Sequence, residues 1–276
     1  MPRNLVVTIL DSCRYDSFVR ARAKNFRRLG EIEQRWSYAS WTAPSHYAYL
    51  MGLVPHRSPQ HVYASEVYKK DFSSWVDRLD IPDLGFSKFI PQLSLAKVLS
   101  DHGYLCQARV SMPVLNGFTL LNRFFADYKL MSNHNDFAGM VKEIEFTADQ
   151  PRFYFLNLGE THYPYMLDGS SMPHISGVHG AVKSLAASGD AGGRIDKEDE
   201  FFDADALRGL HEQQIRCVDY VDELFGALVE KAPPDTYFIV MADHGEAFGE
   251  GGYFGHGPVM HEKVFEIPFV EGLRPS

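Results

Sequence analysis

Short runs that are almost continuously apolar recur along the chain, and they restrict its fold more than any other feature. They occupy residues 5–10, 104–110, 153–158, 237–241 and 267–270. Runs of this length and composition are typical of strands that are covered on both faces. Between them lie helical patterns, such as the apolar spacing over 206–231 and the segment 93–100 with a stop at Gly103. The alternation predicts an α/β fold with a largely parallel central sheet and helices on both faces.

The composition predicts one globular domain without a general nucleic-acid surface. The chain has 276 residues, of which 45% are hydrophobic, and this is enough for a single domain spanning 1–276. The formal net charge of −9 argues against nucleic acid as a partner.

Cysteine usage and the N-terminal segment predict a soluble protein of a reducing compartment. The three cysteines are odd in number and widely spaced, which indicates neither a disulfide framework nor a thiolate metal site. The first apolar run is too short to span a membrane, and no small-residue cleavage site accompanies it. We therefore expect a cytoplasmic protein with no membrane partner.

One segment differs in composition from the rest of the chain. Residues 167–200 are rich in Gly, Ser and Asp, which predicts a long mobile insertion that forms a lid over a site. A loop with no functional role fits the same composition equally well.

The stretch Asp243-His244-Gly245-Glu246, with Gly255-His256-Gly257 after it, follows the apolar run 237–241 directly. A carboxylate and imidazoles without cysteine form a ligand set suited to zinc, manganese or a similar divalent ion. The alternative is a glycine-rich loop that holds a salt-bridged Asp-His pair.

Other potential ligands also follow predicted strands. Asp11 ends the first run, and Glu160 and His162 follow the run 153–158. Ligands gather at the carboxyl ends of parallel strands, so we expect these groups to lie near Asp243 and His244. Asp11 has the alternative role of capping the turn after its strand.

Thr42 stands at the start of a predicted helix, in Ser40-Trp41-Thr42-Ala43-Pro44-Ser45-His46. It is either an N-cap or a hydroxyl placed where a helix N-terminus favours an anion such as phosphate. A free threonine hydroxyl is a poor nucleophile, but a divalent cation lowers the pKa of bound water from about 15.7 to about 7 and acts in the same sense on a hydroxyl. Asp11, Asp243 and His244 could hold such an ion beside Thr42.

With these residues in place, the chain resembles the sulfatase-like branch of the alkaline phosphatase superfamily. Residues 4–16 resemble its opening strand, with Asp11 at the metal-binding position. Thr42 stands at the nucleophile position of the pattern Cys/Ser/Thr-x-Pro-Ser. Further ordered similarities cover 52–56, 155–165, the loop 243–257 and the closing strand 266–270.

Departures from the family pattern refine the expected chemistry. True sulfatases oxidise a Cys or Ser to formylglycine and carry an Arg where this chain has His46. A threonine cannot form that aldehyde, because its carbinol carbon already bears a methyl group. Ser12 and His244 replace an acid and an Asn of the family's calcium site, and a nitrogen ligand shifts the preference toward zinc or manganese.

The resemblance implies a role for each candidate residue. Asp11, Thr42, Asp243 and His244 would hold one divalent ion, with Thr42 as the nucleophile. His162 and His256 would hold a second ion or contact the leaving group, or His162 would bind only the anionic oxygens of the substrate, with Glu160 assisting either role. For His46, Glu246 and His261 we favour surface positions. His56, His61 and Arg14 either line the mouth of the site or are exposed to solvent, and Tyr163 and Tyr165 are expected to pack in the interior.

The expected function is metal-dependent hydrolysis of phosphoric mono- or diesters, with a small-molecule phosphate ester as substrate and a phospho-threonine intermediate. The alternatives are a phosphoryl or phosphoethanolamine-type transferase, a sulfuric ester hydrolase, and a non-catalytic metal-binding module. The sequence shows neither a membrane anchor nor the smaller C-terminal subdomain of related sulfatases, so a soluble hydrolase is expected. Its specificity would then come from 167–200 or from a partner subunit, with homo-oligomerisation covering an exposed sheet edge.

Overall fold

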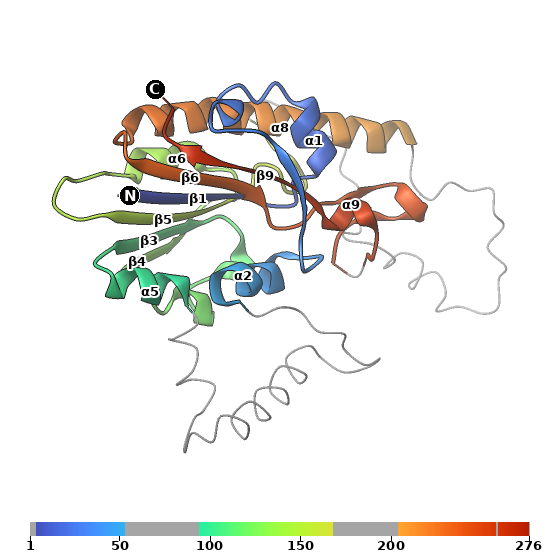
Figure 1. The fold of residues 1–276 in the computed structure, drawn as a ribbon. Helices are drawn as coiled ribbons and strands as arrows, with labels where there is room; N and C mark the ends of the chain where they lie inside the picture. Colours follow the sequence, from blue (N-terminus) through green and yellow to red (C-terminus); the bar gives the residue numbers. More distant parts are fainter. Residues whose placement is uncertain (1–3, 53–93, 168–203, 258, 276) are drawn as a thin grey trace, which may run out of the picture.

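A seven-stranded sheet forms the centre of the protein in a computed structural model that describes residues 4–52, 94–167, 204–257 and 259–275 (Figure 1). The strand order is β2-β9-β6-β1-β5-β3-β4. The bounds are β1 Asn4–Leu10, β2 Glu33–Trp36, β3 Leu105–Val110, β4 Asp127–Leu130, β5 Arg152–Leu158, β6 Thr236–Ala242 and β9 Glu266–Leu273.

The five strands from β6 to β4 run parallel, whereas β9 pairs antiparallel with β6 and β2 pairs antiparallel with β9. The largely parallel sheet predicted from the sequence is therefore confirmed, and all five apolar runs are strands. The edge strands β2 and β4 were not predicted, because they are short, polar and mostly exposed. A small hairpin of β7 (Ala247–Phe248) and β8 (Phe254–Gly255) follows β6.

Helices cover both faces of the sheet (Figure 1). One face carries α1 (Tyr15–Arg20), α6 (Phe137–Glu143) and the long α8 (Ala204–Lys231). The other carries α2 (Thr42–Met51) and α5 (Leu95–Asp101). Short turns of helix are η1 (Phe26–Arg28), η2 (Pro113–Leu115), η3 (Leu120–Asn122), η4 (Glu250–Gly252) and α9 (Glu262–Phe265).

Local sequence explains where several helices begin and end. Ser94 caps α5 by accepting a hydrogen bond from the backbone nitrogen of Lys97, and Asp136 caps α6 through Gly139. Gly52 ends α2 in a left-handed conformation with φ of 66°, which favours glycine.

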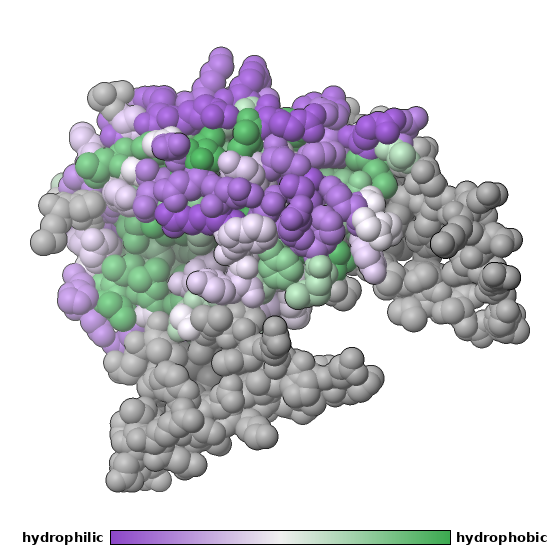
Figure 2. Space-filling model, turned by 45° about the vertical axis from the view of Figure 1, so that its right-hand side comes forward, coloured by the Kyte–Doolittle hydropathy of each residue, from purple (hydrophilic) through white to green (hydrophobic). Residues whose placement is uncertain are grey.

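The long helix α8 is amphipathic. Its buried stripe includes Ile215, Val218, Val221 and Phe225, which pack against the sheet in one of the two main core clusters. Hydrophilic side chains cover its outer side, along the top of Figure 2. Among the described residues, no helix has both the length and the apolar composition needed to cross a bilayer.

The arrangement of strands decides where the site can form. β6, β1 and β5 are neighbours in the sheet and parallel, so the loops after all three leave at the same edge. These loops carry Asp243, Asp11 and Glu160 respectively. Apart from Leu167, the insertion predicted at 167–200 lies outside the described residues.

Candidate metal centre and active site

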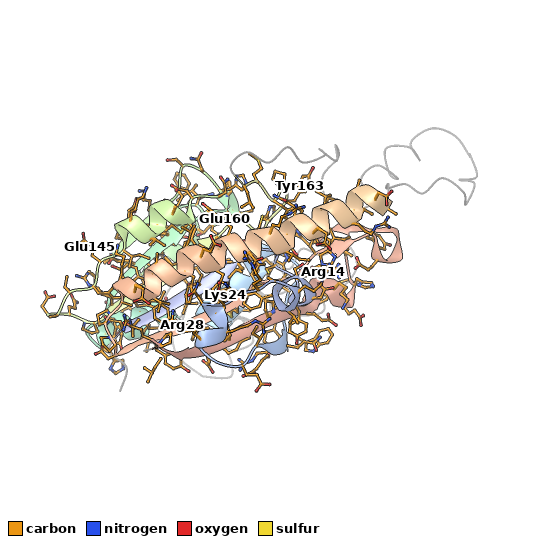
Figure 3. The ribbon with its side chains drawn as sticks, turned by 90° about the horizontal axis from the view of Figure 1, so that it is seen from above. Arg14, Lys24, Arg28, Glu145, Glu160 and Tyr163 are labelled. Atoms are coloured by element: carbon orange, nitrogen blue, oxygen red, sulfur yellow. The ribbon has the colours of Figure 1, made fainter. Side chains whose placement is uncertain are left out.

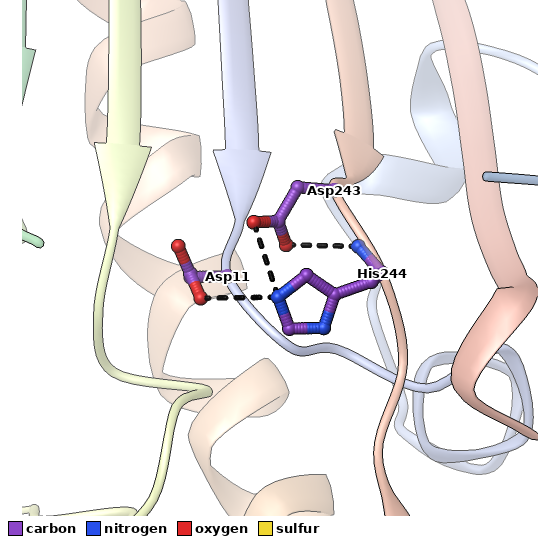
Figure 4. A group of neighbouring side chains, drawn as sticks. All are labelled: Asp11, Asp243 and His244. Carbon is purple, nitrogen blue, oxygen red and sulfur yellow. Dashed lines mark hydrogen bonds and ion pairs between the residues drawn. The ribbon is translucent and has the colours of Figure 1, made fainter. Parts of the chain in front are cut away.

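Asp11, Asp243 and His244 meet at the carboxyl ends of β1 and β6 (Figure 4). All three side chains are buried, and one ligand atom from each lies within 4.8 Å of the others. The Nε2 atom of His244 is 3.9 Å from Oδ1 of Asp11 and 3.4 Å from Oδ2 of Asp243. Within the part of the chain that the structure describes, this is the one cluster of three potential ligands.

Backbone donors hold one oxygen of Asp243 and leave the other available. Its Oδ1 accepts hydrogen bonds from the backbone nitrogens of Ser12, at 3.0 Å, and His244, at 2.9 Å. Ser12 has a φ of 60°, so the turn after β1 passes through the left-handed region and directs this N–H toward Asp243. The buried Oδ2 has no hydrogen-bond partner among the described residues.

The imidazole of His244 is arranged as a neutral ligand. Its Nδ1–H donates to the carbonyl oxygen of Gly245 at 2.8 Å, which leaves the lone pair of Nε2 facing the carboxylates. Burial, with a contribution from the neighbouring His256, lowers the pKa of His244 well below its ordinary value. Gly245 permits this turn because a Cβ there would lie 2.1 Å from the carbonyl oxygen of Lys263.

Thr42 is the first residue of α2, and its hydroxyl lies at the cluster. Its Oγ1 is 3.3 Å from Oδ1 of Asp11 and 3.4 Å from Nε2 of His244. The N-cap is Trp41, which makes no side-chain capping bond. The alternative interpretation of Thr42 as a helix cap is therefore wrong.

These groups fit a divalent cation. Burial and the neighbouring carboxylate of Asp11 raise the pKa of Asp243 well above its ordinary value, because a buried negative charge is costly and a second one close by adds to that cost. The unpartnered Oδ2 of Asp243 marks where a positive charge is needed. Carboxylate, imidazole and hydroxyl donors suit a borderline ion such as zinc or manganese.

His162 and His256 lie beside this cluster rather than within it. The ring of His256 is 4.3 Å from that of His244 and 5.3 Å from that of His162, measured between centroids. His162 donates from Nδ1 to the carbonyl oxygen of Tyr163 at 2.8 Å. A second ion at these two residues stays a prediction.

Glu246 is a buried partner of His256, which corrects the expected surface position. Its Oε1 accepts a hydrogen bond from Nδ1 of His256 at 2.8 Å, and its Oε2 accepts one from the Tyr165 hydroxyl. Burial lowers the pKa of His256, but the hydrogen bond to Glu246 and the charges of Glu246 and Asp11 together outweigh burial and raise that pKa above its ordinary value. Tyr163 and Tyr165 pack in the interior as expected.

His46 is also buried rather than on the surface. Its Nδ1–H donates to the carbonyl oxygen of Thr42 at 2.8 Å, one helical turn earlier. Burial lowers the pKa of His46 to about 4, so the ring is neutral. His261 is partly buried and accepts a bond from the backbone nitrogen of Lys263 as the N-cap of α9.

Arg14 and Glu160 have structural contacts that the sequence did not indicate. Arg14 is only 3% exposed and pairs with Asp16 and Glu250, so it is not exposed to solvent. Glu160 accepts a hydrogen bond at 2.7 Å from the backbone nitrogen of Phe137, at the start of α6 (Figure 3). Its assisting role at the metal centre stays a prediction. His56 and His61 lie outside the described residues.

Two buried amides support the site and were missed by the sequence analysis. Asn157 donates from Nδ2 to Oδ2 of Asp11 at 2.9 Å. Gln214 of α8 donates to the carbonyl oxygens of Ser12 and Thr161 at 2.9 and 3.0 Å, and so joins the loops after β1 and β5. The available signal was a polar residue inside an apolar strand or on the buried side of an amphipathic helix.

Comparisons with known proteins identify the family of this chain. A family model described as Sulfatase matches residues 31–270. A search of curated proteins found no matching sequence. The resemblance noted from the sequence motifs is confirmed by the family match.

Solved structures share the fold across nearly the whole chain. The C-terminal periplasmic domain of the phosphoethanolamine transferase EptC from Campylobacter jejuni is 14% identical with a TM-score of 0.57, and the alignment covers 98% of this chain and 79% of that one. The corresponding domain of EcEptC from Escherichia coli, in complex with Zn, is 13% identical with a TM-score of 0.59 and coverages of 99% and 73%. A 2-O GAG sulfatase is 11% identical with a TM-score of 0.62 and coverages of 100% and 66%.

Proposed function

The chain belongs to the sulfatase family, and from this premise we propose that it is a metal-dependent enzyme that hydrolyses phosphoric esters with Thr42 as its nucleophile. The observation that carries the proposal is the position of the Thr42 hydroxyl. It lies at the N-terminus of α2, 3.3 Å from a carboxylate oxygen of Asp11 and 3.4 Å from Nε2 of His244. A hydroxyl in this place lies beside residues that can hold a cation and at the end of a helix that favours bound anions.

Residue chemistry favours a phosphorus centre over the formylglycine route of sulfatases. That route needs an aldehyde at position 42, which threonine cannot provide. The family's arginine is replaced by His46, whose ring is buried and neutral and bonds to the backbone of Thr42. A direct attack by the threonine oxygen, followed by hydrolysis of the ester that it forms, needs neither group.

The residues present can carry both halves of such a reaction. When bound, a divalent cation supplies positive charge that favours the ionised form of a hydroxyl and neutralises phosphate oxygens. Thr42 Oγ1, after its proton has passed to bulk water, forms a bond to phosphorus while the bond from phosphorus to the leaving alcohol breaks. His256, held through Nδ1 by Glu246, gives a proton to the leaving oxygen. It then takes a proton from the water that attacks the phospho-threonine, which releases phosphate and restores Thr42.

A transferase is the second candidate. It would share the phospho-threonine intermediate and differ only in the acceptor, an alcohol in place of water. The observation that favours it is the fold shared with a phosphoethanolamine transferase domain over 98% of this chain. Product analysis in water with and without candidate alcohols separates the two reactions, because hydrolysis releases all of the phosphate whereas transfer produces a new ester.

The nucleophile is tested by replacing Thr42 with valine, which removes the hydroxyl and keeps the shape of the side chain, and with serine, which keeps the hydroxyl. Thr42→Val in the metal-loaded protein should abolish turnover of nitrophenyl phosphate mono- and diesters, while Thr42→Ser should retain it. Thr8→Val is the matched control, because Thr8 is equally buried in β1 and its hydroxyl has no hydrogen-bond partner among the described residues. Acid quenching followed by mass spectrometry should locate phosphate on Thr42. Full turnover by Thr42→Val would refute the assignment.

A further inference from the structure

The side chain of Asn157 lies between the two elements that carry Asp11 and Thr42. It is fully buried near the end of β5, where it pairs in register with Ile9 of β1. Asn157 falls on the same face of the sheet as Phe153 and Phe155, which belong to the core cluster that contacts α2. A buried amide in that cluster needs polar partners, and the partners show what it does.

The orientation of the amide follows from its neighbours. The carbonyl Oδ1 accepts hydrogen bonds from the backbone nitrogens of Ser111, at 3.3 Å, and Met112, at 3.2 Å. Backbone N–H groups only donate, so the oxygen must face them and the NH2 group must face the other way. One of its N–H bonds points to Oδ2 of Asp11 at 2.9 Å. The other points to Nε2 of His46 at 3.5 Å, which can accept because the ring proton is on Nδ1.

We propose that Asn157 is a positioning residue that selects which oxygen of Asp11 faces the candidate metal centre. This proposal rests on the proposed metal-dependent function. Asn157 engages Oδ2, so Oδ1 is the oxygen that lies 3.3 Å from Thr42 Oγ1 and 3.9 Å from Nε2 of His244. Oδ1 is also contacted by the hydroxyls of Ser12 and Thr42, whereas without the amide donor Oδ2 becomes a buried charge with one fewer hydrogen bond and the two oxygens are no longer told apart by it.

The same amide also reaches the start of α2. Its contact with His46 holds the ring whose other nitrogen donates to the carbonyl oxygen of Thr42. One side chain thus sets the orientation of a ligand from β1 and supports the backbone of the nucleophile. Partners of this kind, one step removed from a metal ligand, typically change metal affinity or activity by about 10–100-fold when they are replaced.

The test measures metal affinity directly, independently of turnover. Asn157→Leu keeps the approximate shape but removes every hydrogen bond, and Asn157→Ser keeps a hydroxyl near Ser111 and Met112 but is too short to reach Asp11. We expect both variants to bind Zn²⁺ and Mn²⁺ about 10–100-fold more weakly than the wild type in competition with a chelating indicator. The serine variant covers the case in which the leucine variant does not fold.

The control is the same substitution at the other end of β1. Asn4 is 2% exposed, donates to Thr236 and accepts from the backbone nitrogen of Arg152. Asn4→Leu therefore also removes a buried amide from the sheet, but about 23 Å from Asp11 along the strand. It should lower the unfolding temperature and leave the metal dissociation constants within twofold of the wild type.

Each outcome assigns success or failure separately to the two proposals. Metal affinities of the Asn157 variants equal to that of the wild type would overturn the role of Asn157 alone. Weakened affinity without any turnover of phosphoric esters by the wild type would overturn the proposed function alone. A wild-type protein that binds neither ion would overturn both.

Discussion

Glu246 Oε1 accepts a hydrogen bond from Nδ1 of His256 at 2.8 Å, which fixes the imidazole beside the candidate metal centre. The carboxylate is fully buried and also accepts a bond from the hydroxyl of Tyr165. A buried carboxylate behind an imidazole holds one tautomer and stabilises the protonated ring. This relationship gives the first prediction, because burial and Glu246 act on the pKa of His256 in opposite directions.

Glu246→Gln should lower the activity about 10–100-fold and move the alkaline limb of the pH–rate profile to lower pH. The reason is that a neutral amide lacks the negative charge with which Glu246 opposes the effect of burial. The pKa of His256 therefore falls, and the ring loses its proton at a lower pH. Tyr165→Phe is the control, since it removes the other bond to Glu246 but keeps the charge. An alkaline limb at the same pH in both variants would contradict the role of Glu246.

Binding of a divalent ion should stabilise the fold through Asp243. An ion whose free concentration is about a hundred times its dissociation constant adds about 2.7 kcal/mol to the free energy of unfolding. For a domain of this size, this corresponds to a rise of roughly 5–10 °C in melting temperature. Asp243→Asn should abolish this rise without unfolding the metal-free protein, because an amide oxygen can still accept the bonds from Ser12 and His244.

The matched control for the metal prediction is Asp222→Asn. Asp222 is another buried carboxylate that accepts bonds from two backbone nitrogens, those of Asn25 and Phe26, but it lies on α8 away from the cluster. Its variant should keep the full metal-dependent rise in melting temperature. Equal loss of the rise in both variants would show that general destabilisation, and not ligation, explains the result.

The convergence of Asp11, Asp243 and His244 could be predicted from sequence because it follows from the parallel direction of the strands that precede them. Each residue comes directly after an apolar run, and the ends of parallel strands share one edge of the sheet. The direction of β9 could not be predicted, because its apolar pattern is the same whether it pairs parallel or antiparallel. β2 gave no signal, since its four residues are all exposed.

The supporting residues could not be predicted for a different reason. Whether Glu246 is buried depends on how the loop after β6 folds back so that His256 meets it, and no local pattern encodes that contact. His46 belongs to α2, in which the spacing of apolar and polar residues does not show whether a polar ring is buried or exposed. Asn157 is visible as a polar residue in an apolar strand, but its partner Asp11, just after β1, is 146 positions away in sequence.

The stability of the protein should depend on pH through Glu160. Burial raises the pKa of this carboxyl from an ordinary value of 4.5 to about 7, so the folded protein binds a proton between these values that the unfolded chain does not. The resulting stabilisation is complete below pH 4.5 and is lost as the pH rises through 7. A shift of this size corresponds to roughly 3 kcal/mol.

Glu160→Gln should therefore remove this part of the pH dependence when unfolding by denaturant is compared at mildly acidic and mildly alkaline pH. The amide can still accept the bond from Phe137, and it carries no charge to be buried at alkaline pH. Glu143→Gln is the control, at the opposite end of α6 from Phe137. The hydrogen bond from Lys129 lowers the pKa of Glu143, so this carboxylate stays ionised at both pH values. The same pH dependence in Glu160→Gln and the wild type would contradict the prediction.

Gln214 should matter for both stability and turnover, because one amide holds two loops of the site together. Its Nε2 donates to the carbonyl oxygens of Ser12 and Thr161, at 2.9 and 3.0 Å, and the side chain is fully buried. Gln214→Leu preserves volume but leaves both carbonyls unpaired and also removes the acceptor of the Ser17 hydroxyl and of the backbone nitrogen of Arg14, which should cost at least about 3 kcal/mol of unfolding free energy. Turnover should also fall about tenfold, since the Ser12 N–H orients Asp243. Gln213→Leu, which removes a single bond to Tyr165, should cost about 1 kcal/mol. If chemical denaturation gave equal losses for the two variants, the linking of the two loops by Gln214 would not be the cause.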